Sequence, residues 1–156
     1  MIRVLFVCLG NICRSPMARS VFEHKVRAAG LDEEIQIDSA GTGDWHVGRP
    51  AHAGTRAVLR ANNIPHEHRA RQITPADLND FDYVIVMDAM NERDVRALDA
   101  GTSPRAHVAR LLDYAPDAGA IDVPDPYHTG GFDHVYALVD AGCDGLLAAI
   151  RRDHGL

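Results

Sequence analysis

The sequence predicts an α/β fold: a single-domain, three-layer αβα sandwich on a mainly parallel, four-stranded sheet. Apolar, strand-like runs alternate with helical patterns along the chain, which favours a parallel sheet covered on both faces. The chain has 156 residues, the length of one domain with a full core. The first predicted strand leads through a tight loop into a helix. We therefore expect residues 1–156 to form one domain with right-handed crossovers.

The first half of the chain alternates in this way up to a proline-containing break. Apolar residues recur at helical spacing before Gly30, which is placed as a C-terminal cap. Alternating apolar residues and glycine-rich turns delimit the strands. The expected elements are a strand over 2–6, a helix over 16–29, a strand over 35–39, a loop around Trp45, a helix over 52–63 stopped by Ile64-Pro65, and a short strand near 66–68.

The second half repeats the alternation and ends in the clearest helix. Apolar residues from Phe132 to Ile150 recur at spacings of three and four, which predicts one amphipathic helix. Residues 113–127 are rich in Pro, Gly and Asp, and a structureless loop of that length is uncommon unless it is functional. The other expected elements are a brief helix over 74–79 capped by Thr74, a strand over 83–87, a helix over 91–100 that Asp88 is placed to cap, and a strand over 107–112.

The loop after the first strand carries the chemistry-bearing residues. Backbone N–H groups and the positive end of a helix dipole converge there, so an anion site is expected after strand one. Cys8 opens the loop and Arg14 closes it. A thiol beside an arginine and a helix N-terminus loses its proton readily, so Cys8 is a candidate nucleophile. The planar fork of Arg14 matches two phosphate oxygens.

Other residues of the loop fit a tight anion cradle. Gly10 lets the backbone approach an anion closely, and Asn11 tolerates positive φ. Ser15-Pro16 is typical of an N-cap followed by proline at the first helical position, and the Ser15 hydroxyl is a candidate donor to the Cys8 sulfur. The phosphate-binding residues expected in the loop are Leu9, Gly10, Asn11, Ile12, Cys13 and Ser15.

Composition excludes several classes of function. A net charge of −6, with no dense Lys/Arg patch, argues against general nucleic-acid binding. No leader is visible, and no apolar run approaches the ~18 residues of a membrane span, so a cytoplasmic location is expected. Three cysteines make no disulfide framework, and no Cys/His set has metal-ligand spacing. We expect no metal and no cofactor.

The loop sequence Cys-Leu-Gly-Asn-Ile-Cys-Arg-Ser-Pro resembles the signature loop of the low-molecular-weight protein tyrosine phosphatases. The resemblance covers nearly the whole chain, because further segments appear in the family's order and at about its spacings: Asp38-Ser-Ala-Gly-Thr, Trp45-His-Val-Gly, His68-Arg-Ala-Arg-Gln, Val86-Met-Asp88 and Asp125-Pro-Tyr127. It implies hydrolysis of phosphotyrosine and small aryl phosphates through a phosphocysteine intermediate on Cys8.

The resemblance also implies roles outside the loop. Asp125 would give a proton to the departing phenol and later take one from water. Trp45 and Tyr127 would line the substrate cleft around the aromatic ring, and His68 would support the loop through Asn11. The family often carries a second aromatic residue after the position of Tyr127, where this chain has His128.

Two further thiols, Cys13 and Cys143, are present in the sequence. Cys13 lies five residues from Cys8 and is a candidate to trap oxidised Cys8 as a reversible disulfide, the alternative being a small buried residue that packs the loop. Cys143, on the apolar face of the last helix, is expected in the core.

Three other functions stay open at this point. An arsenate reductase of the same fold would need two relay cysteines downstream of the loop, where only Cys143 is present. A phosphocysteine carrier would transfer its phosphoryl group to a partner and would need no acid. A non-catalytic phosphotyrosine-binding module would not need Cys8. For the phosphatase, the expected partners are a phosphotyrosine-containing protein as substrate, a tyrosine kinase as a candidate companion, and inorganic phosphate as product.

Overall fold

A four-stranded parallel sheet forms the centre of the computed structural model, which describes residues 1–99, 101 and 103–156. The strands are β1 (Ile2–Cys8), β2 (Ile35–Gly41), β3 (Tyr83–Val86) and β4 (His107–Arg110), in the spatial order β2-β1-β3-β4. Every adjacent pair is parallel, and β1 is central, paired with both β2 and β3. The predicted α/β class and parallel sheet are confirmed.

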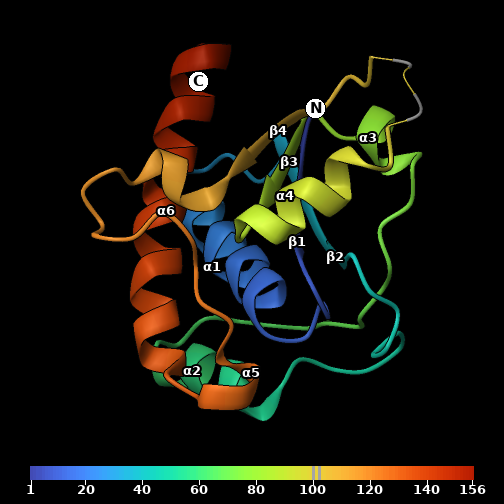
Figure 1. Cartoon of the computed structure of the whole chain (residues 1–156). Coiled ribbons are helices and arrows are strands. Elements are labelled where there is room, and N and C mark those ends of the chain that lie inside the picture. Colours follow the sequence, from blue (N-terminus) through green and yellow to red (C-terminus); the bar gives the residue numbers. More distant parts are fainter. Residues whose placement is uncertain (100, 102) are drawn as a thin grey trace.

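Helices cover both faces of this sheet (Figure 1). On one face lie α1 (Arg14–Ala28), α2 (Ala53–Ala61) and the long α6 (Phe132–His154), with a 3-10 helix at Leu111–Tyr114. On the other face lie α3 (Asp77–Asp80) and α4 (Ala89–Arg96), and the short α5 (Pro126–Thr129) precedes α6. This gives the predicted three layers.

The central strand is apolar along its length because both of its faces are buried. Val4 and Phe6 face the α1 and α6 layer, where the Phe6 and Phe22 rings meet edge to face at 5.4 Å between centroids. Leu5 and Val7 face the opposite layer and pack with Leu78 and Val95. The continuous apolar run at the N-terminus is therefore the signature of a doubly covered strand.

The carboxyl ends of the strands lie at the lower edge in Figure 1, where β1 runs into the loop before α1. Helices α2 and α5 lie at the same end of the molecule. Segments far apart in sequence, around residues 8–14, 41–52 and 123–129, therefore converge on one edge. Ligands bind at this edge in open parallel sheets.

Helix α1 begins two residues earlier than predicted. Its first residue is Arg14 and its N-cap is Cys13, so the assignment of Ser15 as the cap and Pro16 as the first helical residue is wrong. Pro16 is tolerated at the third position because N–H groups of the first turn have no intrahelical acceptor. The helix ends one residue earlier than predicted, because Ala28 is its last residue and Ala29 is the C-cap; Gly30 follows with φ of +71°.

The predicted strand near residues 66–68 is absent, since this segment runs as an extended connection. Pro65 lacks an N–H donor, and the sheet is met only later, where Gln72 forms an isolated bridge to Gly41. Strand β4 is also shorter than the predicted 107–112. It ends at Arg110, whose N–H donates to the Asp113 carboxylate as the chain enters the 3-10 helix.

Three helical boundaries also differ from the prediction. Thr74 does not cap α3: its N–H donates to the Asp77 carboxylate, and the N-cap is Ala76. The helix predicted over 91–100 is α4, which ends at Arg96, and position 100 lies outside the described residues. The predicted loop over 113–127 is helical at both ends, because it includes the end of the 3-10 helix and the start of α5.

Candidate active site

Residues 9–13 form a tight loop between β1 and α1, and most of its carbonyl oxygens accept hydrogen bonds from other segments. The Leu9 carbonyl accepts from Gly43 N–H at 2.9 Å, and the Ile12 carbonyl accepts from His52 N–H at 2.7 Å. The Asn11 carbonyl accepts from His68 Nε2 at 2.6 Å. With the carbonyls engaged in this way, the N–H groups of residues 9–13 donate to no acceptor within the described part of the chain. The loop is therefore a ring of available donors beside a helix N-terminus, which suits an anion.

The conformation of the loop depends on close approach to β2. Asn11 has a φ of +56°, as its residue type suggested. The Cβ of any residue replacing Gly41 would lie 2.8 Å from the Leu9 carbonyl oxygen and 3.0 Å from the Asn11 nitrogen. The glycine in the Asp38-Ser-Ala-Gly-Thr segment is thus needed for the end of β2 to pass directly beside the loop.

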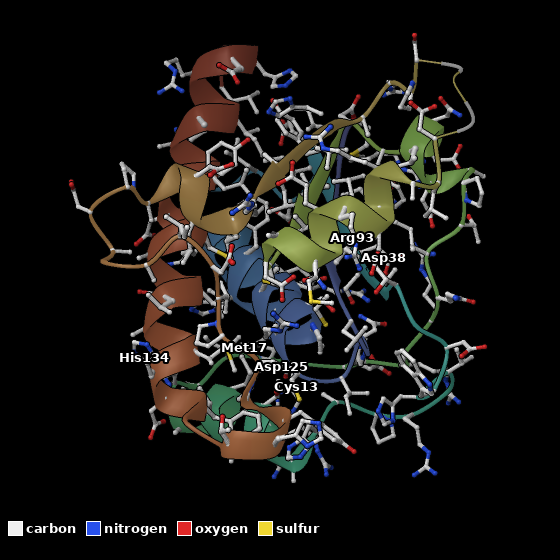
Figure 2. All side chains as sticks on the ribbon, viewed as in Figure 1. Cys13, Met17, Asp38, Arg93, Asp125 and His134 are labelled. Carbon is white, nitrogen blue, oxygen red and sulfur yellow. The ribbon has the colours of Figure 1, made fainter. Side chains whose placement is uncertain are left out.

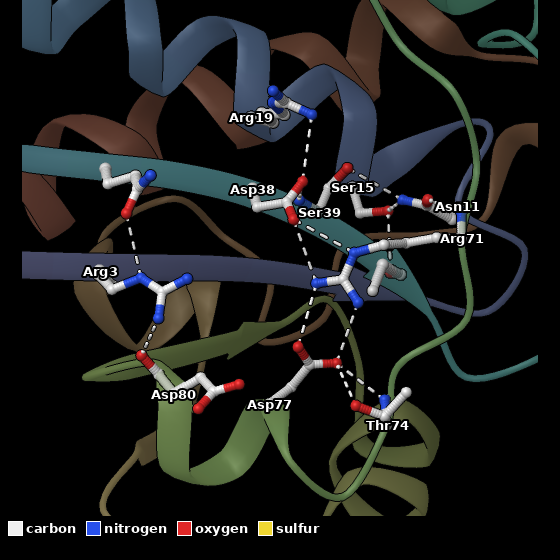
Figure 3. A network of polar contacts seen from close by, with 12 residues as sticks. Arg3, Asn11, Ser15, Arg19, Asp38, Ser39, Arg71, Thr74, Asp77 and Asp80 are labelled. Atoms are coloured by element: carbon white, nitrogen blue, oxygen red, sulfur yellow. Dashed lines mark hydrogen bonds and ion pairs between the residues drawn. The ribbon is translucent and has the colours of Figure 1, made fainter.

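Beneath the loop, the Asn11 side chain is the centre of a buried polar network (Figure 3). Its amide nitrogen donates to Ser15 Oγ at 2.8 Å and to Ser39 Oγ at 3.1 Å, and its amide oxygen accepts from the Arg71 N–H at 2.9 Å. The Arg71 guanidinium in turn binds the Asp77 carboxylate through two nitrogens and also contacts Asp38. The loop is therefore tied to α1, to β2 and to the segment before α3.

His68 supports the loop from the side. Burial lowers the pKa of His68 below its ordinary value, so the ring is neutral at pH 7 and its Nε2–H donates to the Asn11 carbonyl. The predicted contact between His68 and Asn11 is present, through the backbone of Asn11 rather than its side chain.

Cys8 is the last residue of β1, and its sulfur lies above the N-terminus of α1. The side chain is buried among protein atoms, with 2% of the residue exposed, and Ser15 Oγ lies 3.0 Å from the sulfur. Because Asn11 Nδ2 donates to the same hydroxyl, the Ser15 proton can be donated to the Cys8 sulfur at 3.0 Å or to the Ala40 carbonyl at 3.4 Å. The predicted proximity of Ser15 to Cys8 is present.

Arg14 is almost fully buried at the other end of the loop and has two carboxylate neighbours. One terminal nitrogen donates to Asp88 Oδ2 at 2.7 Å and to the Val123 carbonyl at 2.9 Å, and the other lies 3.6 Å from Asp125 Oδ2. Burial opposes the charge of Arg14. The Cys8 sulfur and the carboxylates of Asp88 and Asp125 favour the charged guanidinium more than burial disfavours it, so the pKa of Arg14 is raised above its ordinary value.

Asp88 has a second role that sequence reasoning missed. Its Oδ1 accepts from the Asn91 N–H at 2.7 Å, which confirms the expected cap of α4, while its Oδ2 binds Arg14. The available signal was its position at the carboxyl end of an apolar strand next to β1, the edge where the site was expected.

Cys8, Arg14 and Asp125 meet at a cavity of about 230 Å³. Figure 2 shows Asp125 and Cys13 together at the end of the molecule where α5 lies. Asp125 is the N-cap of α5 and accepts from the Tyr127 N–H at 3.1 Å, which directs the carboxylate toward the loop. The residues that line the cavity are Cys8, Leu9, Gly10, Ile12, Cys13, Arg14, Trp45, His46, Asp125, Tyr127 and His128.

The mouth of the cavity is aromatic and exposed. Trp45 is 68% exposed, Tyr127 is 43% exposed and Leu9 is 40% exposed. The Trp45 ring packs on Gly43, where an added Cβ would collide with it. The Tyr127 ring contacts the His46 and His128 rings at 5.7 and 4.8 Å between centroids. Sequence reasoning did not include His46, although it follows Trp45 directly.

Two of the predicted phosphate-binding residues are not in the cavity through their side chains. Asn11 is 1% exposed and Ser15 is fully buried, and both side chains are engaged beneath the loop. Neither Asn11 nor Ser15 is therefore among the residues that line the cavity. Their polar groups are used to hold the loop and the Cys8 sulfur instead.

The three cysteines are free thiols in different surroundings. Cys13 lines the cavity beside Cys8, and burial, with Cys8 and Asp125 nearby, raises the pKa of its thiol to about 12. Cys143 is buried in the core between α1 and α6, as expected, and burial raises its pKa further.

None of the described helices has the length and apolar character that crossing a bilayer requires.

The site is built at the edge of the sheet, with the loop, a buried guanidinium and a carboxylate converging from three parts of the chain. This arrangement can bind a tetrahedral oxyanion and present a sulfur to it.

Comparison with known proteins identifies the family. The family model described as low molecular weight phosphotyrosine protein phosphatase matches residues 3–155. The chain is 50% identical over 157 residues to the low molecular weight protein-tyrosine-phosphatase YfkJ of Bacillus subtilis, covering 100% of both chains. It is 44% identical to a low molecular weight protein-tyrosine-phosphatase of Streptomyces coelicolor, covering 96% of this chain and 94% of the relative.

The fold agrees with this match. The crystal structure of YfkJ from Bacillus subtilis superposes with a TM-score of 0.94, covering 99% of this chain and 97% of the other. The family match spans the strand, loop and helix that carry Cys8 and Arg14, and the late segment that carries Asp125. The chain therefore belongs to the low molecular weight phosphotyrosine protein phosphatase family.

Proposed function

We propose that this phosphatase acts through Cys8 as nucleophile, Arg14 as the phosphate-binding cation and Asp125 as the general acid and base. The observation that carries the proposal is the convergence of these three side chains on one cavity, with Ser15 Oγ 3.0 Å from the sulfur. We take residues 1–156 as one phosphatase domain, supported by the family match over residues 3–155.

The reaction proceeds in two displacements at phosphorus. The Cys8 thiolate forms an S–P bond while the bond from phosphorus to the phenol oxygen breaks, and Asp125 gives its proton to that oxygen. Water then attacks phosphorus, Asp125 takes a proton from it, and the S–P bond breaks to release phosphate and the thiolate. The N–H groups of residues 9–13, with Arg14, stabilise the charge on the equatorial oxygens in both steps.

The aromatic mouth supports an aryl phosphate as substrate. Trp45 and Tyr127 offer ring faces to a phosphotyrosine side chain, and Leu9 adds apolar surface at the entrance. The family resemblance implies a second aromatic residue after Tyr127, and His128 in its place leaves one less apolar face for the substrate ring. The proposed substrates are phosphotyrosine-containing proteins.

The alternatives are less well supported. A reductase relay would require Cys143 to exchange disulfides with the loop, yet its thiol is fully buried in the helical core and does not line the cavity. A carrier would not need Asp125 beside Arg14. A non-catalytic binding module would not need a sulfur beneath the anion site.

Cys13 is proposed to protect Cys8 from irreversible oxidation. Both thiols line the same cavity, and attack of Cys13 on a Cys8 sulfenic acid would form a disulfide and release water. After peroxide treatment, mass spectrometry should find a Cys8–Cys13 bond that thiol reverses. Reversible inactivation without that bond would end this part of the proposal.

Reducing surroundings keep Cys8 able to react, and the three free thiols support a cytoplasmic location. A tyrosine kinase acting on the same protein is the proposed companion enzyme. Dephosphorylation of that kinase or its substrates in cell extract would support this pairing, and unchanged phosphotyrosine on deletion of the phosphatase would contradict it.

The proposal is tested by turnover of a phosphotyrosine peptide. Cys8→Ser should abolish turnover while retaining phosphate binding, and Asp125→Asn should slow phosphoenzyme formation by about 10²–10⁴-fold. Normal turnover in either variant refutes the role assigned to that residue. One equivalent of dephosphorylated peptide per enzyme, with no further turnover, would favour the carrier.

A further inference from the structure

The segment that delivers Asp125 is attached to the molecule just before the carboxylate. Val123 is completely buried, its N–H donates to the Met87 carbonyl at 2.9 Å, and its own carbonyl accepts from Arg14 at 2.9 Å. This contact fixes one point of the backbone two residues from Asp125. The direction in which the backbone reaches this point depends on a second attachment, made one residue earlier at Asp122.

That second attachment is Arg110, the last residue of β4. One guanidinium nitrogen donates to Asp122 Oδ1 at 3.2 Å, and Nε donates to Glu92 Oε1 at 2.9 Å. Hydrogen bonds from Arg110 and Arg96 lower the pKa of Glu92 below its ordinary value, so Glu92 is charged at neutral pH. Arg110 therefore bridges α4 and the segment that precedes Asp125.

The two segments that Arg110 joins are those that supply the carboxylates beside Arg14. Asp88 caps α4 four residues before Glu92, and Asp125 follows Asp122 by three residues. Displacement of either segment would change where a carboxylate stands relative to the Arg14 guanidinium. Arg110 touches neither Cys8 nor the cavity, so any effect it has on chemistry is transmitted through these segments.

We propose that Arg110 is a positioning residue that holds Asp125 in line with the leaving-group oxygen, through its bridge between Glu92 and Asp122. The proposal rests on the function proposed above for Asp125. Because the bridge lies at the surface, its expected effect is modest and is confined to reactions that need the acid.

Arg96 provides a matched control. It binds the other oxygen of the same carboxylate, Glu92 Oε2, at 2.9 Å, and it contacts the Val108 carbonyl but not Asp122. Arg96→Met and Arg110→Met therefore each remove one positive charge and one partner of Glu92. Only Arg110→Met releases the segment that carries Asp125.

The test compares two substrates that differ in their need for the acid. Phenol has a pKa close to the ~10 of tyrosine and requires a proton on leaving, whereas nitrophenolate leaves as a stable anion. We expect Arg110→Met to lower kcat/KM for phenyl phosphate by about three- to tenfold and for p-nitrophenyl phosphate by less than about twofold. Arg96→Met should leave the ratio of the two values unchanged.

Asp122→Asn keeps the shape of the partner and should reproduce the ratio of Arg110→Met. The double variant should be no worse than either single variant, because both remove the same bridge. Equal loss on both substrates, no loss on either, or the same change in Arg96→Met would overturn the proposal. If Arg110→Met fails to fold, the ratio of kcat/KM for the two substrates in Asp122→Asn tests the proposal instead.

Asp125→Asn separates this inference from the function on which it rests. It should lower kcat/KM for phenyl phosphate far more than for p-nitrophenyl phosphate. If Asp125→Asn shows that preference and Arg110→Met does not, Arg110 is not a positioning residue while the role of Asp125 stands. If Asp125→Asn shows no preference, the proposed acid itself is wrong.

Discussion

The two sides of the Cys8 loop are built in opposite ways. The floor, defined as Asn11, Ser15, Ser39, His68 and Arg71, lies beneath the loop and is joined by hydrogen bonds of 2.6 to 3.1 Å. The rim, defined as Leu9, Trp45, His46, Tyr127 and His128, surrounds the mouth and makes ring contacts. Asn11, Ser15 and Ser39 are each at most 1% exposed, whereas Trp45 is 68% exposed.

This contrast indicates that the floor and the rim have different functions. A largely buried, hydrogen-bonded floor holds the loop in one geometry, which is what stabilisation of a developing charge requires. An exposed rim with few polar contacts can change partners at little cost to the fold. Substitutions in the floor should therefore reduce the rate constant and stability together, and substitutions in the rim should change substrate affinity alone.

The largest effect is expected from Asn11→Ala. It removes three side-chain hydrogen bonds and leaves buried partners unsatisfied, at about 1 kcal/mol for each bond. For a chain of this size the loss corresponds to a fall in Tm of about 6–12 °C. Because the loop loses its geometry, kcat should fall by about 100-fold. Thermal unfolding measures the fall in Tm, and steady-state kinetics measure the fall in kcat.

Asn11→Gly is the matched control for backbone strain at this position. Glycine tolerates the φ of +56°, so this variant loses the side-chain bonds without the strain that alanine would add. Asn11→Gly should be more stable than Asn11→Ala but still slow. Wild-type kcat in either variant would show that the floor does not set the rate.

Ser15→Ala should have the next largest effect. It removes the hydroxyl that lies 3.0 Å from the Cys8 sulfur and also accepts from Asn11. A hydrogen bond to a charged group contributes about 1.5–3 kcal/mol, so loss of this contact to the proposed thiolate nucleophile should lower kcat by about tenfold or more in steady-state kinetics. Ser15→Thr, which keeps a hydroxyl, should retain more activity than Ser15→Ala. Equal kinetics in both variants would contradict the contact.

Rim substitutions should sharpen the contrast by acting on affinity. Trp45→Ala and Tyr127→Ala remove exposed rings, and an aromatic pair contributes about 0.5–1.5 kcal/mol. KM for a phosphotyrosine peptide should rise by about two- to tenfold for each, while kcat and Tm stay near the wild-type values. Val47→Ala removes a neighbouring exposed side chain outside the cavity lining and serves as the control. A fall in kcat to the level of Asn11→Ala would erase the division between floor and rim.

The smallest effect concerns pH and the ion pairs of Glu92, which belong to neither region. Hydrogen bonds from Arg110 and Arg96 lower its pKa, so the folded state binds a proton less readily than the unfolded state. Its stabilisation is present above the unfolded pKa of about 4.3 and is lost as pH falls through the lower, folded value. Between about pH 5 and pH 3, wild-type Tm should therefore fall more than the Tm of Glu92→Gln, by no more than about 4 °C. Parallel Tm curves would contradict this assignment.

Patterns that are local in sequence predicted most of the fold. The apolar run before Cys8 is continuous because both faces of β1 are buried. Apolar residues in the last helix recur at helical spacing because one face of α6 is buried, and both elements are present as predicted. The start of α1 was misjudged because the Ser15 hydroxyl serves the Cys8 sulfur and Asn11 instead of capping the helix. The assumed strand near residue 67 failed because edge pairing depends on tertiary context.

Of the site residues, Cys8 and Arg14 could be placed from the loop itself, because spacing, glycine and a following helix define an anion cradle. Asp125 needed the family resemblance, since an Asp-Pro pair alone is typical of a turn. The Asp88 contact with Arg14 and the bridge of Arg110 between Glu92 and Asp122 join different elements of the fold. Such contacts have no local pattern that sequence reasoning could detect.

Rapid acid quench during turnover tests the central claim most directly. Wild-type enzyme mixed with a phosphotyrosine peptide and quenched within one turnover should carry one phosphoryl group, which peptide mass spectrometry should locate on Cys8. Asp125→Asn should carry the same group at the same residue, formed more slowly. A phosphoryl group on another side chain, or steady turnover with unmodified Cys8 in every quenched sample, would contradict the account.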